Sequence, residues 1–258
     1  MENTNRFDLM MTTLTELDKE TGASPAPASP SLKSILDQAG SLPHEALFLG
    51  MANDGLPILL NLYDAVPGPI LITGDVKSGK TTLLKMIARA AEHLHTPPEV
   101  QYGVVTTRPA EWVRFQFSKT NAGVYATRDE ATAELLQSLV TWAHNNKGDQ
   151  QSILLLIDDL DALIKGNDQT EQNLRWLLSR GPNRRVWPIV TLNAARAAEL
   201  PDWLGFFRTR LFGRVQDAHT AGIITGASNA PLGYLVPGTQ FTMKEDHEWL
   251  GFWAPSID

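Results

Sequence analysis

Hydrophobic and polar residues follow two different rhythms along this chain, one typical of buried strands and one typical of amphipathic helices. The longest apolar run, Ile153–Ile157, has five residues, which suits a strand buried on both faces. Between residues 129 and 144, leucines recur three and four positions apart, which predicts a helix with one apolar face. Strand patterns separated by such helices favour a mostly parallel sheet covered on both faces.

The same patterns place the other elements from residue 45 onward. Two apolar runs flank a polar turn at Asn53–Gly55 and predict a β-hairpin ahead of the parallel strands. The end of the chain, Thr239–Phe252, is expected to form one or two edge strands. The other expected strands are Ala46–Leu49, Pro57–Leu62, Pro69–Thr73, Val100–Thr106, Gly123–Ala126, Ser152–Ile157 and Val186–Leu192, and the expected helices are Thr81–His95, Asp129–His144 and Thr170–Ser179. The predicted fold class is α/β.

The beginning of the chain differs from the rest. Residues 1–21 are polar with a weak helical periodicity, and residues 22–31 read GASPAPASPS. Prolines among small polar residues make an extended, flexible linker. We therefore expect a flexible arm over residues 1–31, either with a docking role or with none, and a single domain over residues 32–258.

Composition narrows the class of protein. The chain has 258 residues, of which 43% are hydrophobic and 20% charged, an ordinary globular composition. It contains no cysteine, which excludes disulfides, thiolate zinc sites and cysteine nucleophiles. No secretory signal and no apolar run long enough for a bilayer is visible, so we expect a cytoplasmic protein without a membrane span.

Charge is distributed unevenly. The net charge of −7 argues against a globally basic nucleic-acid binder. However, residues 175–214 hold eight arginines and only two acidic residues. Such asymmetry predicts a surface that meets phosphates or the carboxylates of a partner.

The most specific motif lies between the strand at residues 70–72 and the helix that follows. Residues 74–81 read GDVKSGKT, which fits the phosphate-loop pattern G-x-x-x-x-G-K-[ST] without a mismatch. Lys80 is expected to reach the β- and γ-phosphates of a nucleotide, and Thr81 to offer its hydroxyl to Mg²⁺. Lys77 either adds charge at the phosphates or is a solvated loop lysine. The residues expected to bind nucleotide are Gly74, Asp75, Val76, Lys77, Ser78, Gly79, Lys80, Thr81 and Thr82.

Acidic and amide residues follow two other predicted strands. Asp158 and Asp159 come directly after Ile153–Ile157, and the carboxyl ends of strands are where open α/β sheets bind ligands. Asp158 is expected to hold Mg²⁺ and Asp159 to orient the attacking water as a general base. The alternative for both is an acidic cap on the next helix. Asn193, after Val186–Leu192, either senses the γ-phosphate or forms a turn.

With these motifs placed, the chain resembles the FtsK–HerA superfamily of P-loop motor ATPases over roughly residues 45–255. The resemblance implies a RecA-like fold that binds ATP and Mg²⁺. The segments that carry it, besides the phosphate loop, are Leu49–Leu62, Val124–Leu139, Ile157–Leu163, Leu178–Leu192, Arg208–Gly226 and Pro237–Gly238.

The resemblance also implies assembly. Members of this superfamily form rings, usually hexamers, in which an arginine of one subunit completes the site of its neighbour. Arg180, Arg184 and Arg185 are the candidates here, although each is equally compatible with a solvated surface position. The family moves DNA or, in its type VII secretion branch, proteins. We therefore expect an ATP-hydrolysing homo-oligomeric motor acting on DNA.

Departures from the family pattern keep a second hypothesis open. Asp159 stands where DNA-pumping members have Glu, and Asn193 stands where they have Gln. Thr106–Pro109 replaces an Asp-Pro-Lys segment, and neither an appended winged helix nor a membrane segment is visible. The alternative is a slow, nucleotide-gated ATPase that presents a Trp203–Phe207 patch to a protein partner. Most of the seven tryptophans, by contrast, are expected to pack in the interior.

Overall fold

The structure, a computed structural model, describes residues 30–40, 42–146, 151–245 and 248–257. Residues 1–29, which hold most of the predicted flexible arm, lie outside the described residues. The described part of the domain begins with helix α2 (Leu32–Ala39), whose first turn is capped by the Ser31 side chain. In that part of the chain no helix is long and apolar enough to cross a membrane.

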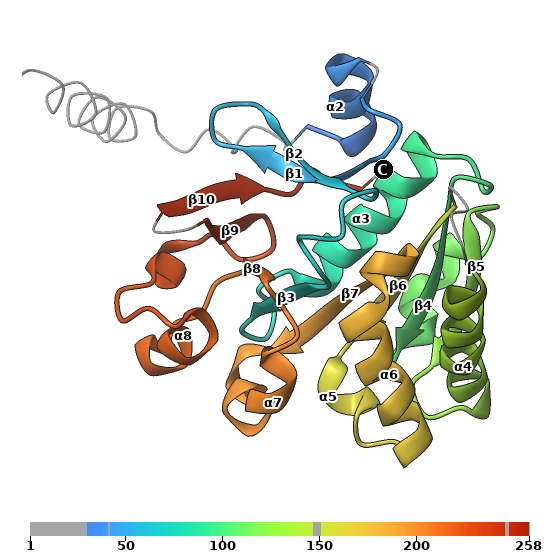
Figure 1. The fold of residues 1–258 in the computed structure, drawn as a ribbon. Helices are drawn as coiled ribbons and strands as arrows, with labels where there is room; N and C mark the ends of the chain where they lie inside the picture. The colour runs from blue at the N-terminus through green and yellow to red at the C-terminus, as the bar shows by residue number, and fades with distance from the viewer. Residues whose placement is uncertain (1–29, 41, 147–150, 246–247, 258) are drawn as a thin grey trace, which may run out of the picture. The chain divides into compact units, whose positions relative to one another are not determined.

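A ten-stranded sheet runs through the described residues in the order β2-β1-β10-β9-β8-β3-β7-β6-β4-β5 (Figure 1). The six strands from β8 to β5 in this order are parallel, whereas the other four pair in antiparallel fashion. The strands are β1 (Ala46–Ala52), β2 (Pro57–Asn61), β3 (Ile70–Gly74), β4 (Val100–Thr106), β5 (Asn121–Ala126), β6 (Ser152–Asp158), β7 (Val186–Asn193), β8 (Thr209–Phe212), β9 (Gln240–Glu245) and β10 (Glu248–Trp253).

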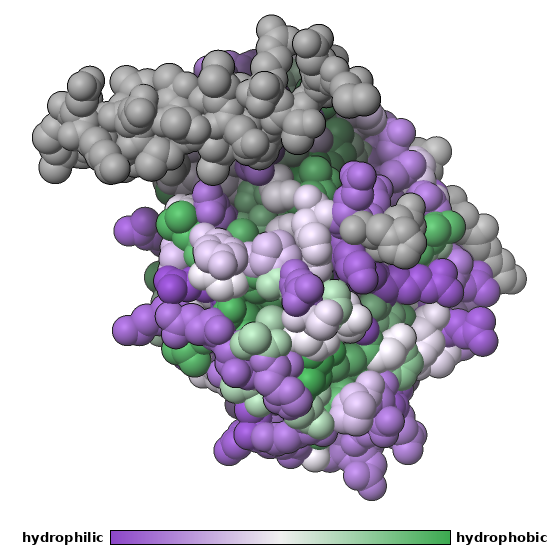
Figure 2. All heavy atoms as spheres, turned by 90° about the vertical axis from the view of Figure 1, so that its left-hand side faces the viewer, coloured by the Kyte–Doolittle hydropathy of each residue, from purple (hydrophilic) through white to green (hydrophobic). Residues whose placement is uncertain are grey.

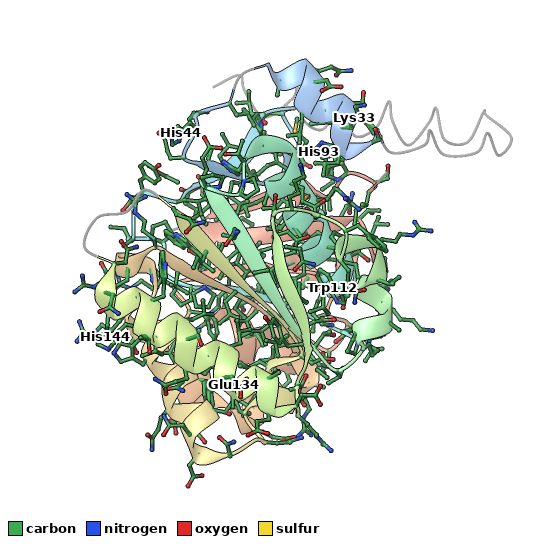
Figure 3. The ribbon with its side chains drawn as sticks, turned by 90° about the vertical axis from the view of Figure 1, so that its right-hand side faces the viewer. Lys33, His44, His93, Trp112, Glu134 and His144 are labelled. Atoms are coloured by element: carbon green, nitrogen blue, oxygen red, sulfur yellow. The ribbon has the colours of Figure 1, made fainter. Side chains whose placement is uncertain are left out.

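Helices cover both faces of the sheet. The α-helices after α2 are α3 (Lys80–Leu94), α4 (Glu130–Asn145), α5 (Leu160–Leu163), α6 (Asp168–Arg180), α7 (Pro201–Leu204) and α8 (Ala218–Thr225), and the 3₁₀ helices are η1 (Pro109–Phe115), η2 (Pro182–Arg184), η3 (Ala194–Glu199) and η4 (Pro231–Tyr234). Figure 3 looks onto α4, with Glu134 and His144 toward its two ends, and onto strands β4 and β5 behind it. The predicted α/β class with a mostly parallel sheet between helices is confirmed.

Alternation along the strands divides the interior into two cores. In β6, Leu154 and Leu156 pack into the core under α2, α3 and η1. Leu155 and Ile157, which point to the opposite face, pack under α4, α5 and α6. All four side chains are fully buried, which explains why the run Ile153–Ile157 carries no polar residue.

The predicted hairpin forms, but the strands at the end of the chain are not edge strands. β10 pairs with β1 through Met51 opposite Trp253, and β9 pairs with β8 through Leu211 opposite Met243. The hairpin therefore adds outside β10, and β2 and β5 become the edges of the sheet. The prediction was wrong because the hairpin comes first in the sequence yet pairs with the last strand.

The proposed Trp203–Phe207 patch is also wrong as a surface. Trp203 is 5% exposed and Phe207 is 2% exposed. The guanidinium of Arg175 lies 4.2 Å from the ring centre of Trp203, and Arg210 donates to three backbone carbonyls nearby. The aromatic side chains here pack against neighbouring elements, as Trp112 and Trp187 do elsewhere with no exposed surface.

Candidate nucleotide-binding site

The predicted phosphate loop connects the carboxyl end of β3 to the start of α3. Gly79, the residue before the helix, has a left-handed backbone with φ 97°, which glycine adopts without strain. A Cβ at this position would lie 2.6 Å from the Cα of Gly238. The Gly238 amide also donates to the carbonyl oxygen of Ser78 at 3.0 Å. The second glycine of the motif is thus required by both backbone shape and close packing.

Lys80 lies inside this loop. Its Nζ donates to the carbonyl oxygens of Gly74 at 3.0 Å and Asp75 at 2.7 Å. Burial lowers the pKa of the Lys80 amine, while the nearby carboxylates of Asp159 and Asp158 oppose that shift. The amine is therefore held at the place where a loop of this type meets phosphate oxygens.

Asp158 and Thr81 meet across the gap between β6 and α3. The carboxylate oxygen Oδ1 of Asp158 accepts from the Thr81 hydroxyl at 2.9 Å and from the Thr191 hydroxyl at 3.0 Å. The other oxygen, Oδ2, is buried and accepts no hydrogen bond from any described residue. A buried carboxylate oxygen that accepts no hydrogen bond, beside a hydroxyl, fits Mg²⁺, which prefers oxygen ligands.

The carboxylate of Asp158 would not hold a metal ion alone. In the described residues, no three His, Asp or Glu side chains gather as a metal cluster. Mg²⁺ in nucleotide sites commonly takes one or two protein oxygens and completes its shell with phosphate and water. The residues present therefore suit a metal that arrives with its nucleotide.

Asp159 has an unusual backbone. Its φ is 77°, a left-handed value that costs a non-glycine residue about 1–3 kcal/mol. Its amide donates to the Thr191 hydroxyl at 2.8 Å, and its carboxylate accepts from the Thr107 hydroxyl at 3.2 Å. Burial and the charge of Asp158 raise the pKa of the Asp159 carboxyl group. This geometry turns the side chain away from a helix-capping position and toward the site.

A cavity of about 520 Å³ lies between the phosphate loop and Asp159. The predicted residues from Val76 to Thr82 line it, except Ser78, and so do Asp159 and Asn193. Asn193 lies beside Gly74 in the β3–β7 register, and its side-chain oxygen accepts from the Ala195 amide at 3.3 Å. Asn193 therefore forms a turn and also lines the cavity.

Gly74, Asp75 and Ser78 shape the loop from behind. The Asp75 amide donates to the carbonyl oxygen of Arg214 at 2.9 Å, and its carboxylate accepts from the Gln216 amide at 2.9 Å. The Ser78 hydroxyl is 2.5 Å from where a Cβ on Gly74 would stand, so only glycine fits there. These residues fix the loop to the segment that follows β8.

The three candidate arginines lie at the other end of β7. Arg180 ends α6, Arg184 ends η2, and Arg185 precedes β7, whereas Asn193 is the last residue of that strand. A strand of this length spans about 23 Å. The Arg185 guanidinium lies 3.7 Å from the ring centre of Tyr63, while Arg180 and Arg184 are exposed. None of the three contributes to the cavity of its own chain.

Besides Gly238, four residues of the site were not predicted. Thr107, Thr191, Arg108 and Glu111 contact the two acidic residues or line the cavity. Thr107 and Arg108 follow β4, and Thr191 lies near the end of β7. The carboxyl-end rule that selected Asp158 would have selected them, had it been applied to every strand.

Comparison with solved structures places the fold. The chain is similar to EssC (ATPases 2 and 3) from Geobacillus thermodenitrificans, with a TM-score of 0.71 at 14% identity over 92% of this chain and 48% of that one. It is similar to Thermomonospora curvata EccC (ATPases 2 and 3) in complex with a signal sequence peptide, with a TM-score of 0.70 at 13% identity over 99% of this chain and 50% of that one.

A third solved structure is matched over most of its own length as well as over most of this chain. The pCW3 conjugation coupling protein TcpA, in a monomer form with ATPγS, gives a TM-score of 0.68 at 15% identity over 97% of this chain and 82% of that one. The chain spans about half the length of the EssC and EccC structures. No protein-family model matches the chain, and no curated protein matches it in sequence. The similarity therefore confirms the RecA-like P-loop fold that the sequence resemblance implies.

Proposed function

We propose that this chain is a Mg²⁺-dependent ATPase of the FtsK–HerA kind and acts as a motor subunit in the cytoplasm. The observation that carries the proposal is the meeting of Lys80 and Thr81, which line one cavity, with the buried carboxylate of Asp158, whose Oδ1 accepts from Thr81 and whose Oδ2 accepts no hydrogen bond. Two motifs about 80 residues apart in the sequence, the phosphate loop and the acidic end of β6, converge there in the arrangement that ATP and Mg²⁺ require.

Each residue then has a defined task. Lys80 and the amides of the loop bind the phosphates, and Thr81 with Asp158 would hold Mg²⁺, which neutralises phosphate charge when bound. Asp159 orients the attacking water and accepts its proton. Asn193, between β3 and β6 at the same edge, contacts the γ-phosphate or that water through its amide group.

Replacing Asp159 by asparagine is expected to separate binding from hydrolysis. Asparagine tolerates a left-handed backbone better than most residues, so the local fold is kept while the base is lost. Turnover should fall by about 10²- to 10⁴-fold, with Mg·ATP affinity unchanged within about threefold. Steady-state ATPase assays and calorimetry on the same preparation measure both quantities.

The conservative variant Asp159→Glu tests the second hypothesis. If the shorter acid makes hydrolysis slow, glutamate should raise turnover above the wild-type rate. A wild-type rate near ~1 s⁻¹ or above, unaffected by glutamate, would instead rule out a slow nucleotide gate.

A ring of identical subunits, such as a hexamer, is part of the proposal. Exposed hydrophobic side chains lie in the phosphate loop and in the segment that precedes Gly238, the residue that contacts this loop. Val76 is 70% exposed, Val236 is 51% exposed, and Tyr234 in η4 is 92% exposed. On the side of the molecule shown in Figure 2, hydrophobic residues lie between hydrophilic ones. In such a ring, Arg180, Arg184 or Arg185 of a neighbouring subunit would complete the nucleotide site in trans.

DNA is the proposed substrate, and a protein substrate is the alternative. The neighbouring structures include a conjugation coupling protein and type VII secretion ATPases, one of them in complex with a signal sequence peptide. Of the arginines in residues 175–214, Arg180, Arg184 and Arg208 are exposed, and exposed guanidinium groups favour phosphates. If DNA is the substrate, duplex DNA should raise ATP turnover severalfold at low salt and progressively less as salt is added.

Two measurements on the purified chain test the DNA substrate and the ring: ATPase activity with and without duplex DNA, and molecular mass in solution with and without Mg·ATP. A turnover that no DNA changes would remove the DNA clause and leave the protein alternative. A monomer mass under all nucleotide conditions would remove the ring.

A further inference from the structure

We propose that Arg108 binds the γ-phosphate of ATP held by the same chain, and that Glu111 positions it for that contact. This inference rests on the proposed ATPase function and adds a residue to its site. It concerns the segment Thr106–Glu111, which runs from the last residue of β4 into η1. This segment belongs neither to the phosphate loop nor to the acidic motif.

The position of Arg108 is defined by contacts on both sides. Its backbone amide donates to the buried Thr106 hydroxyl at 3.1 Å, at the carboxyl end of β4. One guanidinium nitrogen, Nη1, lies 2.8 Å from Oε1 of Glu111. The other, Nη2, faces Asp158 with 3.9 Å to its Oδ2. The guanidinium therefore lines the cavity at the level of the metal-binding carboxylate.

The contact with Asp158 is too long for a hydrogen bond, which leaves donors of Arg108 unused. A hydrogen bond between nitrogen and oxygen has a length of 2.7–3.2 Å, and the separation here is 3.9 Å. The Arg108 side chain is also 53% exposed. A guanidinium with free N–H groups beside a nucleotide cavity matches the oxygen geometry of a terminal phosphate.

Glu111 is held in turn by the helix that follows the phosphate loop. Its Oε2 lies 3.4 Å from Nζ of Lys85 in α3, and its Oε1 faces Arg108. Trp112, the next residue of η1, is fully buried and is labelled in Figure 3. Glu111 is thus a positioning residue on a firmly packed turn, and its carboxylate orients one edge of the guanidinium while the other edge stays open to the cavity.

The inference predicts a difference between two nucleotides. ADP lacks the γ-phosphate, so Arg108 should contribute to the binding of ATP but not of ADP. Replacing Arg108 by alanine should weaken binding of Mg²⁺ with a slowly hydrolysed ATP analogue by about tenfold or more, because a hydrogen bond to a charged group is lost. Binding of Mg·ADP should change by less than about twofold.

Calorimetry on the full chain with both nucleotides is the test. Arg114→Ala is the matched control, since Arg114 is an exposed arginine of the same turn and does not line the cavity. Glu111→Ala should weaken binding of the ATP analogue by about threefold. The double variant Arg108→Ala/Glu111→Ala should bind the analogue with the same affinity as Arg108→Ala alone, because Glu111 acts through Arg108.

An equal loss for both nucleotides in Arg108→Ala, or no loss for either, would overturn the inference and leave the ATPase proposal intact. A double variant that sums the two single losses would overturn the role of Glu111. A wild-type chain that binds neither nucleotide would overturn the inference together with the ATPase proposal. Thermal melts that match the wild type show that the variants are folded.

Discussion

Replacing Lys80 by alanine is expected to weaken Mg·ATP binding by about 10²- to 10⁴-fold and to reduce ATP turnover to background. The Lys80 amine lies inside the loop, bound to two loop carbonyls, and no other lysine or arginine side chain among the described residues reaches those carbonyls. Alanine removes the charge-assisted hydrogen bonds to two phosphates, each worth about 1.5–3 kcal/mol. Calorimetry with Mg·ATP measures the loss of affinity.

Lys77 provides the comparison for that experiment. It also belongs to the loop, and its backbone is left-handed with φ 65°. Lys77→Gly removes the charge and keeps a backbone that glycine adopts freely. We expect a loss below about tenfold. If Lys80→Ala bound Mg·ATP as well as the wild type, the loop would not be a nucleotide site and the proposed function would fail.

Replacing Asp158 by asparagine is expected to abolish the Mg²⁺ dependence of nucleotide binding and to lower turnover by about 10²-fold or more. Asparagine keeps the shape and the hydrogen bonds from Thr81 and Thr191, but it removes the negative charge from the Oδ2 position, which accepts no hydrogen bond. Binding of ATP should be measured with magnesium and with a chelator. The two affinities should coincide in the variant and differ in the wild type.

Asp161 gives a matched control. It lies three residues further on, in α5, where its carboxylate pairs with Lys165 at 3.8 Å and Arg196 at 3.6 Å outside the nucleotide cavity. Surface ion pairs contribute about 0–1 kcal/mol, so Asp161→Asn should bind and hydrolyse like the wild type. Retained magnesium dependence in Asp158→Asn would refute the metal assignment.

The parallel half of the fold was predictable because its signals are local. A short apolar run such as Ile153–Ile157 favours a strand covered on both faces, and the phosphate loop combines a strand, glycines and a helix in one short segment. These signals do not depend on which strand lies beside which. The predicted strand Val100–Thr106 accordingly matches β4 residue for residue.

The rest depended on contacts between distant residues. β8 has four residues, two of them the polar Thr209 and Arg210, so its sequence carries little strand signal; it is specified by pairing with β3 and β9. The interior position of β10 depends on its pairing with the hairpin, some 200 residues earlier in the chain. Arg108 was not among the predicted site residues because the carboxyl-end rule was applied only to strands followed by acidic or amide residues, and its ion pair with Asp158 joins two different strands.

The contact between Gly79 and Gly238 couples the two halves of the sheet mechanically. With a Cβ excluded at 2.6 Å and a hydrogen bond of 3.0 Å from the Gly238 amide to Ser78, the phosphate loop has no free space on that side. Any widening of the loop as phosphates enter or leave must push the turn at residues 236–239, which leads directly into β9. If the chain binds ATP as proposed, we expect the antiparallel strands to shift with the phosphate loop and a spectroscopic probe on β9 to register ATP exchange without touching the cavity.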